Sequence, residues 1–132
     1  MNHRTVCDAS ALVAVLVDGG AAGEWATTAI GGADLLGPHL LLFETANILR
    51  RHELAGLVSA DQAAQAHIDL LDLPVELWPY EALALRAWEL RANLASYDAA
   101  YVALAELTGT PLVTLDERIA RSPGVRCSVV TP

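Results

Sequence analysis

Apolar residues follow two distinct patterns along the chain. Short apolar runs, bounded by Gly, Pro or Asp, predict strands at 4–8, 35–36, 75–78, 111–115 and 126–130. Longer stretches, in which apolar residues recur every three or four positions, predict helices at 10–17, 21–30, 38–54, 59–71, 81–94, 97–108 and 117–121. Pro38 is expected to open one of these helices, and Ser59 and Gln62 resemble the capping box that opens another.

Strands that alternate with helices place the chain in the α/β class. We expect a mostly parallel central sheet of four to five short strands, flanked by helices on both faces. The 132 residues suit one domain, 1–132. The apolar runs are too short to cross a bilayer. The acidic residue Asp8 lies just before the apolar run 11–17, which argues against a secretory signal peptide. We therefore expect a cytoplasmic protein without a membrane association, in which Cys7 and Cys127 are reduced and serve as small hydrophobes.

Four acidic residues lie where apolar elements normally carry no charge, namely Asp8, Glu44, Asp98 and Asp116. Asp8 and Asp116 close two predicted strands, and ligands of open parallel sheets bind at the carboxyl ends of strands. Glu44 shares its helix face with leucine and isoleucine residues. Buried carboxylates are costly, so we expect these four to take up protons or to share a cation.

Two of the acids also have a plain structural explanation. Asp98, in the first turn of a predicted helix, would interact favourably with the helix dipole, although Tyr101 one turn on indicates that it faces inward. Glu44 would form a buried ion pair with Arg50 or Arg51. Arg51 is seven residues further on, about 10 Å along the axis, which excludes a direct pair within the helix.

A shared cation accounts for all four acids together. At separations of about 5 Å, each ionised pair would repel by roughly 3 kcal/mol at an effective dielectric constant of about 20. Carboxylate oxygens without Cys or His are the ligands that Mg²⁺ and Mn²⁺ prefer. A zinc site is not expected, because His52 and Glu53 are followed by Gly56 where the zinc-binding motif needs a second histidine.

The net charge of −8 argues against a nucleic-acid partner when taken alone. One bound divalent cation changes the charge from −8 to −6 and a second changes it to −4, at the place where a phosphate would bind. All eight basic residues are arginine, which binds phosphate in a bidentate manner. We therefore expect a nucleic acid to bind productively only after the metal.

The segments around the four acids resemble those of the PIN-domain ribonucleases, and among these the VapC toxins of toxin–antitoxin pairs. The segments are 6–12, 37–51, 96–101 and 112–118. They occur in the family order with family-like spacing and span nearly the whole chain. A single such motif is weak evidence, whereas four in register are specific.

The resemblance implies a single PIN domain, 1–132, that acts as an endoribonuclease. In such an enzyme Asp8, Glu44, Asp98 and Asp116 hold one or two Mg²⁺ or Mn²⁺ ions, and water attack on RNA leaves a 5′-phosphate and a 3′-hydroxyl. The resemblance further implies a toxin that inhibits translation by cutting tRNA or rRNA. It also implies a homodimer, and a VapB-type antitoxin that forms a hetero-oligomer with the toxin and covers the acidic pocket with its tail.

Five further residues are candidates for supporting roles in such a site. Ser10 and Thr114 are candidates to orient metal-bound water, and local backbone hydrogen bonding explains each equally well. Glu117 stands where relatives often carry a further aspartate, and we favour a solvent-facing position at the start of a short helix. Arg118 is the first candidate for an RNA phosphate contact, and Arg51 is the second.

Three alternative functions keep part of this pattern. A phosphotransfer enzyme or receiver domain also places an aspartate at the end of its first strand, but such sites require a lysine and this chain has none. A catalytically silent PIN binding module is disfavoured because all four acids are present. A housekeeping RNA-processing nuclease of the same fold differs from a toxin in lacking a neighbouring antitoxin-like gene.

Overall fold

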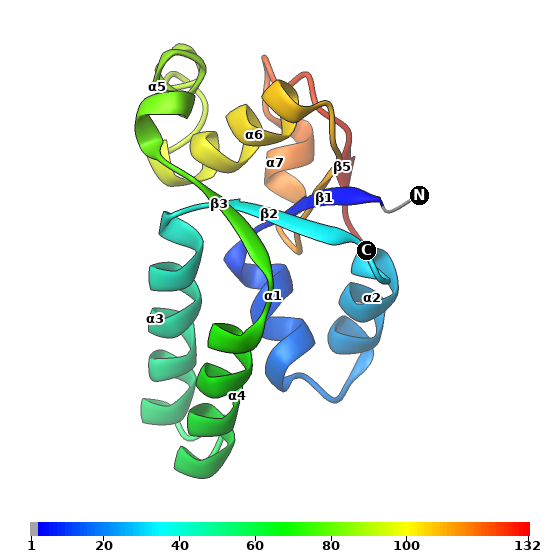
Figure 1. Ribbon diagram of the computed structural model, residues 1–132, viewed down its shortest axis with the longest axis vertical. Helices are drawn as coiled ribbons and strands as arrows, with labels where there is room; N and C mark the ends of the chain where they lie inside the picture. Colours follow the sequence, from blue (N-terminus) through cyan, green and yellow to red (C-terminus); the bar gives the residue numbers. More distant parts are fainter. Residues whose placement is uncertain (1–2) are drawn as a thin grey trace.

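A five-stranded parallel sheet forms the centre of the computed structural model, which describes residues 3–132 (Figure 1). The strand order is β3-β2-β1-β4-β5, and every neighbouring pair is parallel. The strands are β1 (Arg4–Cys7), β2 (Asp34–Pro38), β3 (Val75–Trp78), β4 (Leu112–Val113) and β5 (Val129–Val130). The predicted α/β class with a short-stranded parallel sheet is confirmed.

Helices cover both faces of this sheet. They are α1 (Ala9–Val17), α2 (Ala21–Ile30), α3 (Leu40–Leu54), α4 (Ala60–Asp72), α5 (Tyr80–Glu89), α6 (Ser96–Thr108) and α7 (Glu117–Arg121). Figure 1 shows α1 to α4 on one side of the sheet and α5, α6 and α7 on the other, with the α3–α4 pair extending away from it. None of the helices between residues 3 and 132 has the length and apolarity that a membrane span requires.

The hydrogen bonds of the structure show that several helices and strands begin or end at other residues than predicted. Pro38 does not open α3 but ends β2, where it pairs with Trp78. The next amide, of His39, donates to the Trp78 carbonyl (2.9 Å), so the helix begins only at Leu40. The strands predicted at 111–115 and 126–130 shrink to two residues each, because only those residues pair in the sheet.

The helix predicted at 81–94 is also too long. It ends at Glu89, and hydrogen bonds that span three residues, such as Asn93 to Leu90 (3.1 Å), form tight turns there. Leu90 and Leu94 continue the helical spacing of apolar residues beyond the end of the helix, which is why the predicted helix was too long. Leu90 is buried and Leu94 is half-buried, although both follow the helix. The capping box of α4 is confirmed, since Ser59 and Gln62 exchange hydrogen bonds of 3.0 and 2.8 Å.

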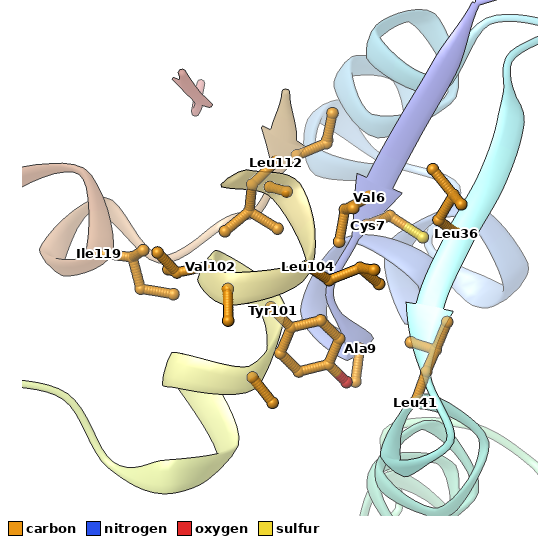
Figure 2. Close-up of a cluster of buried hydrophobic side chains, with 14 of the residues drawn as sticks. Val6, Cys7, Ala9, Leu36, Leu41, Tyr101, Val102, Leu104, Leu112 and Ile119 are labelled. Atoms are coloured by element: carbon orange, nitrogen blue, oxygen red, sulfur yellow. The ribbon is translucent and has the colours of Figure 1, made fainter. Parts of the chain in front are cut away.

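Helix α6 forms the centre of the core. Seven consecutive residues from Ala99 to Ala105 are buried, and the helix lies against β1, β2, β4 and α5. Figure 2 shows Leu104 beside Cys7 of β1, and the Tyr101 ring between α6 and Ala9 at the start of α1. The core therefore fixes the beginning of α6, which carries Asp98, against the beginning of α1, which follows Asp8.

Close packing between β2 and α3 fixes the start of α3 in the same region. A Cβ atom on Gly37 would lie 2.5 Å from the Leu41 Cδ2 atom, so only glycine allows this approach without a shift. Leu41 is fully buried. The first turn of α3, which leads to Glu44, is thereby held against the carboxyl end of the sheet.

Candidate active site

Asp8 lies at the junction of β1 and α1, where its side chain caps the helix. Its Oδ1 atom accepts hydrogen bonds from the Ala11 amide (3.1 Å) and the Ser10 hydroxyl (2.6 Å), and the Thr114 hydroxyl donates to Oδ2. The residue is only 7% exposed. Burial raises the pKa of Asp8, the hydrogen bonds from Ser10, Thr114 and Ala11 oppose the rise, and the charge of Asp116 adds to it.

The two hydroxyls also bind the loop that follows β4. Ser10 Oγ accepts from the Leu115 amide (3.1 Å), and Thr114 Oγ1 accepts from the Asp116 amide (3.0 Å). Each hydroxyl therefore donates to the Asp8 carboxylate and accepts from the backbone next to Asp116. Ser10 and Thr114, predicted as candidates to orient water, are placed as links that align Asp8 with the strand end carrying Asp116.

Glu44 enters the site from the second turn of α3. The Tyr101 hydroxyl donates to Glu44 Oε1 (2.7 Å), which connects α3 to α6. Burial raises the pKa of Glu44, the Tyr101 hydrogen bond opposes this, the charges of Asp98 and Asp8 raise it further and that of Arg51 lowers it. The pKa of Tyr101 is also raised, by burial and by Glu44, so its hydroxyl stays protonated and donates.

Asp98 lies in the first turn of α6, half-buried as expected from its inward-facing position. Burial raises its pKa, the charges of Asp116 and Asp8 raise it further, and the charge of Arg118 lowers it. The charges of two other acids reach Asp98, which places these carboxylates in the same region of the protein. We call Asp8, Glu44, Asp98 and Asp116 the acid corner.

Asp116 differs from the other three acids because an arginine side chain pairs with it. Its side chain is 26% exposed, and Arg118 donates to both of its oxygens, from Nε to Oδ1 (3.0 Å) and from Nη2 to Oδ2 (2.7 Å). This pairing lowers the pKa of Asp116. Only Asp8 is fully buried, so the expectation that all four acids are buried is wrong for Glu44, Asp98 and Asp116, which are partly exposed.

The remaining candidates lie on the surface. Arg51 is exposed near the end of α3, and the Arg118 side chain is 81% exposed apart from its contact with Asp116. Glu117 is exposed at the start of α7, 3.8 Å from Arg121, while Asp116 is the residue that caps the helix. Sequence analysis missed the role of Tyr101 as the partner of Glu44; its position one turn after Asp98 was the available signal.

The donor set suits a hard divalent cation in kind, since all four side chains are carboxylates. Among residues 3–132, however, no group of three or more His, Cys, Asp or Glu side chains is arranged so that it could hold a metal ion. Asp116 turns both oxygens to Arg118, and Glu44 turns one to Tyr101. Three of the four acids, Asp8, Glu44 and Asp116, are thus engaged by protein partners.

Comparison with known proteins identifies the family of the chain. The family model described as PIN domain matches residues 5–125. Ribonuclease VapC9 of Mycobacterium tuberculosis is 38% identical over 124 residues, and the alignment covers 94% of each chain. The chain belongs to the VapC ribonucleases of the PIN domain family. The resemblance seen in its four acidic segments is confirmed.

Solved structures of VapC proteins share the fold. Mycobacterium tuberculosis VapC20, a Sarcin-Ricin loop cleaving toxin, superposes with a TM-score of 0.69 at 20% identity, covering 97% of this chain and 99% of its own. VapBC2 from Rickettsia felis, bound to a DNA fragment from its promoter, gives 0.67 at 12% identity and covers 97% and 98%. These similarities support the PIN architecture.

Proposed function

We propose that this VapC-family chain is a divalent-metal-dependent endoribonuclease toxin, with Asp8, Glu44, Asp98 and Asp116 as its catalytic and metal-binding residues. The observation that carries the proposal is that carboxylates from four separate segments lie close enough for their charges to influence one another. Burial and mutual repulsion raise the pKa of Asp8, Glu44 and Asp98. Such a cluster is stabilised when a cation neutralises it.

Mg²⁺ or Mn²⁺, as one or two ions, would supply Lewis-acid stabilisation of the phosphate and a water of lowered pKa. The protein itself holds the carboxylates that would bind the ion in fixed orientations. Ser10 and Thr114 hold the Asp8 carboxylate in one orientation, and Tyr101 holds Glu44. Fixed ligands of this kind need little rearrangement when substrate binds, which favours catalysis.

RNA is the proposed substrate, with tRNA and rRNA as the candidate targets and loss of translation as the consequence. Arg118 would exchange its contact with Asp116 for an RNA phosphate once a cation neutralises that carboxylate. Arg51 provides a second positive charge whose influence reaches Glu44. Both arginines are exposed and therefore accessible to a polyanion.

A VapB-type antitoxin is the proposed partner, within a hetero-oligomer that contains a toxin homodimer. The Rickettsia felis structure is that of VapBC2 bound to a DNA fragment from its promoter. The pairing of Arg118 with Asp116 indicates that a guanidinium fits the acid corner. An arginine from an antitoxin tail would bind there in the same way and replace the metal charge.

Substitution of the two half-buried acids tests the nuclease activity. Glu44→Gln and Asp98→Asn should abolish RNA cleavage in Mg²⁺ while the proteins stay folded. The exposed acids Glu53 and Asp72 provide matched controls as Glu53→Gln and Asp72→Asn. Cleavage by Glu44→Gln at the wild-type rate would rule out the assignment. Co-purification with the product of a neighbouring gene, followed by sequencing of RNA ends after induction, tests the toxin assignment.

A further inference from the structure

A cavity of about 460 Å³ opens beside the acid corner. Val13 and Val17 of α1 form one wall, and Ile48 of α3 forms the wall that faces it. Leu57 and Val58, in the turn between α3 and α4, contribute further apolar surface. The volume lies within the range of sites that bind small organic groups, and such sites are mostly apolar with a few polar groups.

The cavity is continuous with the acid corner. Ser10 and Leu115 line it, and the same Ser10 hydroxyl donates to Asp8 and accepts from the Leu115 amide. On α3, Ile48 lies one turn beyond Glu44, so one helix face leads from the acids into the cavity. A polymer whose phosphate is held at the acids can therefore place the adjoining unit in the cavity.

The cavity wall formed by Leu57 and Val58 is preformed. The Leu57 and Val58 amides both donate to the His52 carbonyl, at 2.8 and 3.4 Å, and this ties the turn to the end of α3. Gly56 makes the turn possible with a left-handed φ of 77°. Leu57 is held in this turn with 70% of its surface exposed. Its apolar side chain is thus presented to a ligand at little conformational cost.

Charged groups near the cavity favour a nucleotide as the ligand. Arg51 lines the cavity, and its positive charge lowers the pKa of Glu44, so its field extends to the acid corner. Asp18 lines the cavity where α1 ends and accepts from the Gly20 amide through Oδ1 (2.7 Å). A carboxylate accepts several hydrogen bonds, so Asp18 remains able to receive an amino group.

We propose that this cavity binds the base of the nucleotide beside the scissile phosphate. The base lies between the aliphatic walls of α1 and α3, its phosphate contacts Arg51, and its amino group donates to Asp18. Adenine and cytosine carry such an amino group at the position where guanine and uracil present a carbonyl oxygen. The inference rests on the proposed ribonuclease function and adds a preference for a splayed, single-stranded adenosine or cytidine.

Binding of short fluorescent oligo-A, oligo-C and oligo-U RNAs to the full chain tests the site. Fluorescence anisotropy is measured in the non-cleaving Glu44→Gln background. Leu57→Ala and the cavity-filling Val17→Trp should weaken oligo-A and oligo-C binding by about fivefold or more. Leu54→Ala is the matched control, because Leu54 is 68% exposed at the same helix end and does not line the cavity. Its affinities should remain those of the parent.

Asp18→Asn tests the base preference. Asparagine still accepts from Gly20 but can also donate to uracil, so the preference of oligo-A and oligo-C over oligo-U should disappear. The same variants are assayed for cleavage with Glu44 restored. Leu57→Ala should raise KM for an RNA with cytidine or adenosine beside the cut, and replacing that nucleotide by an abasic unit should make wild type and variant equal.

The possible results separate this site from the nuclease function. A wild type that cuts no RNA in Mg²⁺ overturns the proposed function. A wild type that cuts RNA, with Leu57→Ala and Val17→Trp equal to it in affinity and KM, overturns the base site alone. Equal losses in Leu54→Ala overturn it as well. Loss of binding to the VapB-type partner in Leu57→Ala, with RNA binding unchanged, would assign the cavity to a protein and overturn the proposal.

Discussion

The Arg118 guanidinium donates to both carboxylate oxygens of Asp116, at 3.0 and 2.7 Å. The Arg118 amide also donates to Oδ1 (3.0 Å), so Asp116 caps α7 and binds the side chain of the same residue. The charge of Arg118 lowers the pKa of Asp98 as well. Arg118 thus acts as the counter-ion of the acid corner, in the role that a metal ion would take over.

Removing this counter-ion should strengthen metal binding and weaken RNA binding. Arg118→Gln is expected to bind Mn²⁺ about two- to fivefold more tightly, because the substitution removes a positive charge that competes with the ion for Asp116. The gain is small because an exposed ion pair contributes little free energy. The same variant should bind RNA less tightly, since a phosphate contact is lost. Calorimetric titration with Mn²⁺, and anisotropy with an RNA oligonucleotide, measure the two effects.

Arg121→Gln is the matched control for Arg118. It lies on the same short helix and is exposed, and its contact with Glu117 is longer, at 3.8 Å. Its Mn²⁺ affinity should stay close to that of the wild type. The counter-ion interpretation is wrong if both variants gain Mn²⁺ affinity equally, or if Arg118→Gln gains none.

Tyr101→Phe should impair the site without disturbing the core. The ring stays buried, and only the hydrogen bond to Glu44 is lost, which is expected to change the free energy of unfolding by about 1 kcal/mol. Mn²⁺ affinity and RNA cleavage should fall by about tenfold, since partners that orient a ligand typically matter to that extent. Tyr80→Phe, a half-exposed control, should alter neither. A lowered melting temperature, with Mn²⁺ affinity and RNA cleavage unchanged, would indicate that the Tyr101 hydroxyl has a purely structural role.

Thr114→Val should destabilise the protein more than Ser10→Ala. Thr114 is fully buried, and loss of its hydroxyl leaves Asp8 Oδ2 and the Asp116 amide without that partner, at an expected cost of about 1–3 kcal/mol. Ser10 is partly exposed, so water compensates for part of its loss. Because both hydroxyls bind Asp8, the double variant should deviate from the sum of the single ones.

Urea unfolding of Thr114→Val, Ser10→Ala and the double variant, each compared with the wild type, measures these differences. Thr28→Val, at an exposed position of α2, controls for the general effect of replacing a hydroxyl. Additive effects, or a larger cost for Ser10→Ala, would contradict the view that Thr114 is the principal support of Asp8. Equal unfolding midpoints for all variants would contradict it too.

Sequence analysis found the elements and the four acids because each is marked locally. The spacing of apolar residues distinguishes a strand from a helix. An acidic residue among leucines, such as Glu44, can be recognised from the sequence alone. The contacts that organise the site are not local, since Thr114 and Asp8 are 106 residues apart and Tyr101 and Glu44 are 57 apart. The exposure of Asp116 also depends on how the loop after β4 turns, which the apolar pattern does not encode.

Glu106 provides a contrasting acid outside the acid corner. Arg86 donates to it from Nε (2.6 Å) and Nη2 (3.3 Å), and the Arg126 amide donates at 2.8 Å, which joins α6, α5 and the segment before β5. Burial would raise the pKa of Glu106, but the Arg86 hydrogen bond, the Arg126 amide and both arginine charges outweigh it and lower the pKa. The side chain is 12% exposed, so solvent screens the pair only in part.

Glu106 should therefore stabilise the fold at neutral pH and lose this effect in acid. Its pKa is lower when folded than the unfolded value of about 4.3, so its contribution is complete above that pH and disappears as the pH falls through the folded pKa. Asp8, Glu44 and Asp98 act in the opposite sense, because their raised pKa values favour the folded state at low pH. The wild-type profile combines both, and a variant is needed to separate them.

Glu106→Gln isolates the contribution. At pH about 7 it should be less stable than the wild type by roughly 2 kcal/mol, because Arg86 loses its charged partner in a largely buried position. The difference should narrow below pH about 4, where the wild-type glutamate takes up a proton. Glu89→Gln, whose side chain is 63% exposed and 3.4 Å from Arg86, should differ little from the wild type throughout. A Glu106→Gln deficit in urea unfolding that stays constant from neutral to acid pH would show that the ion pair does not lower the pKa of Glu106.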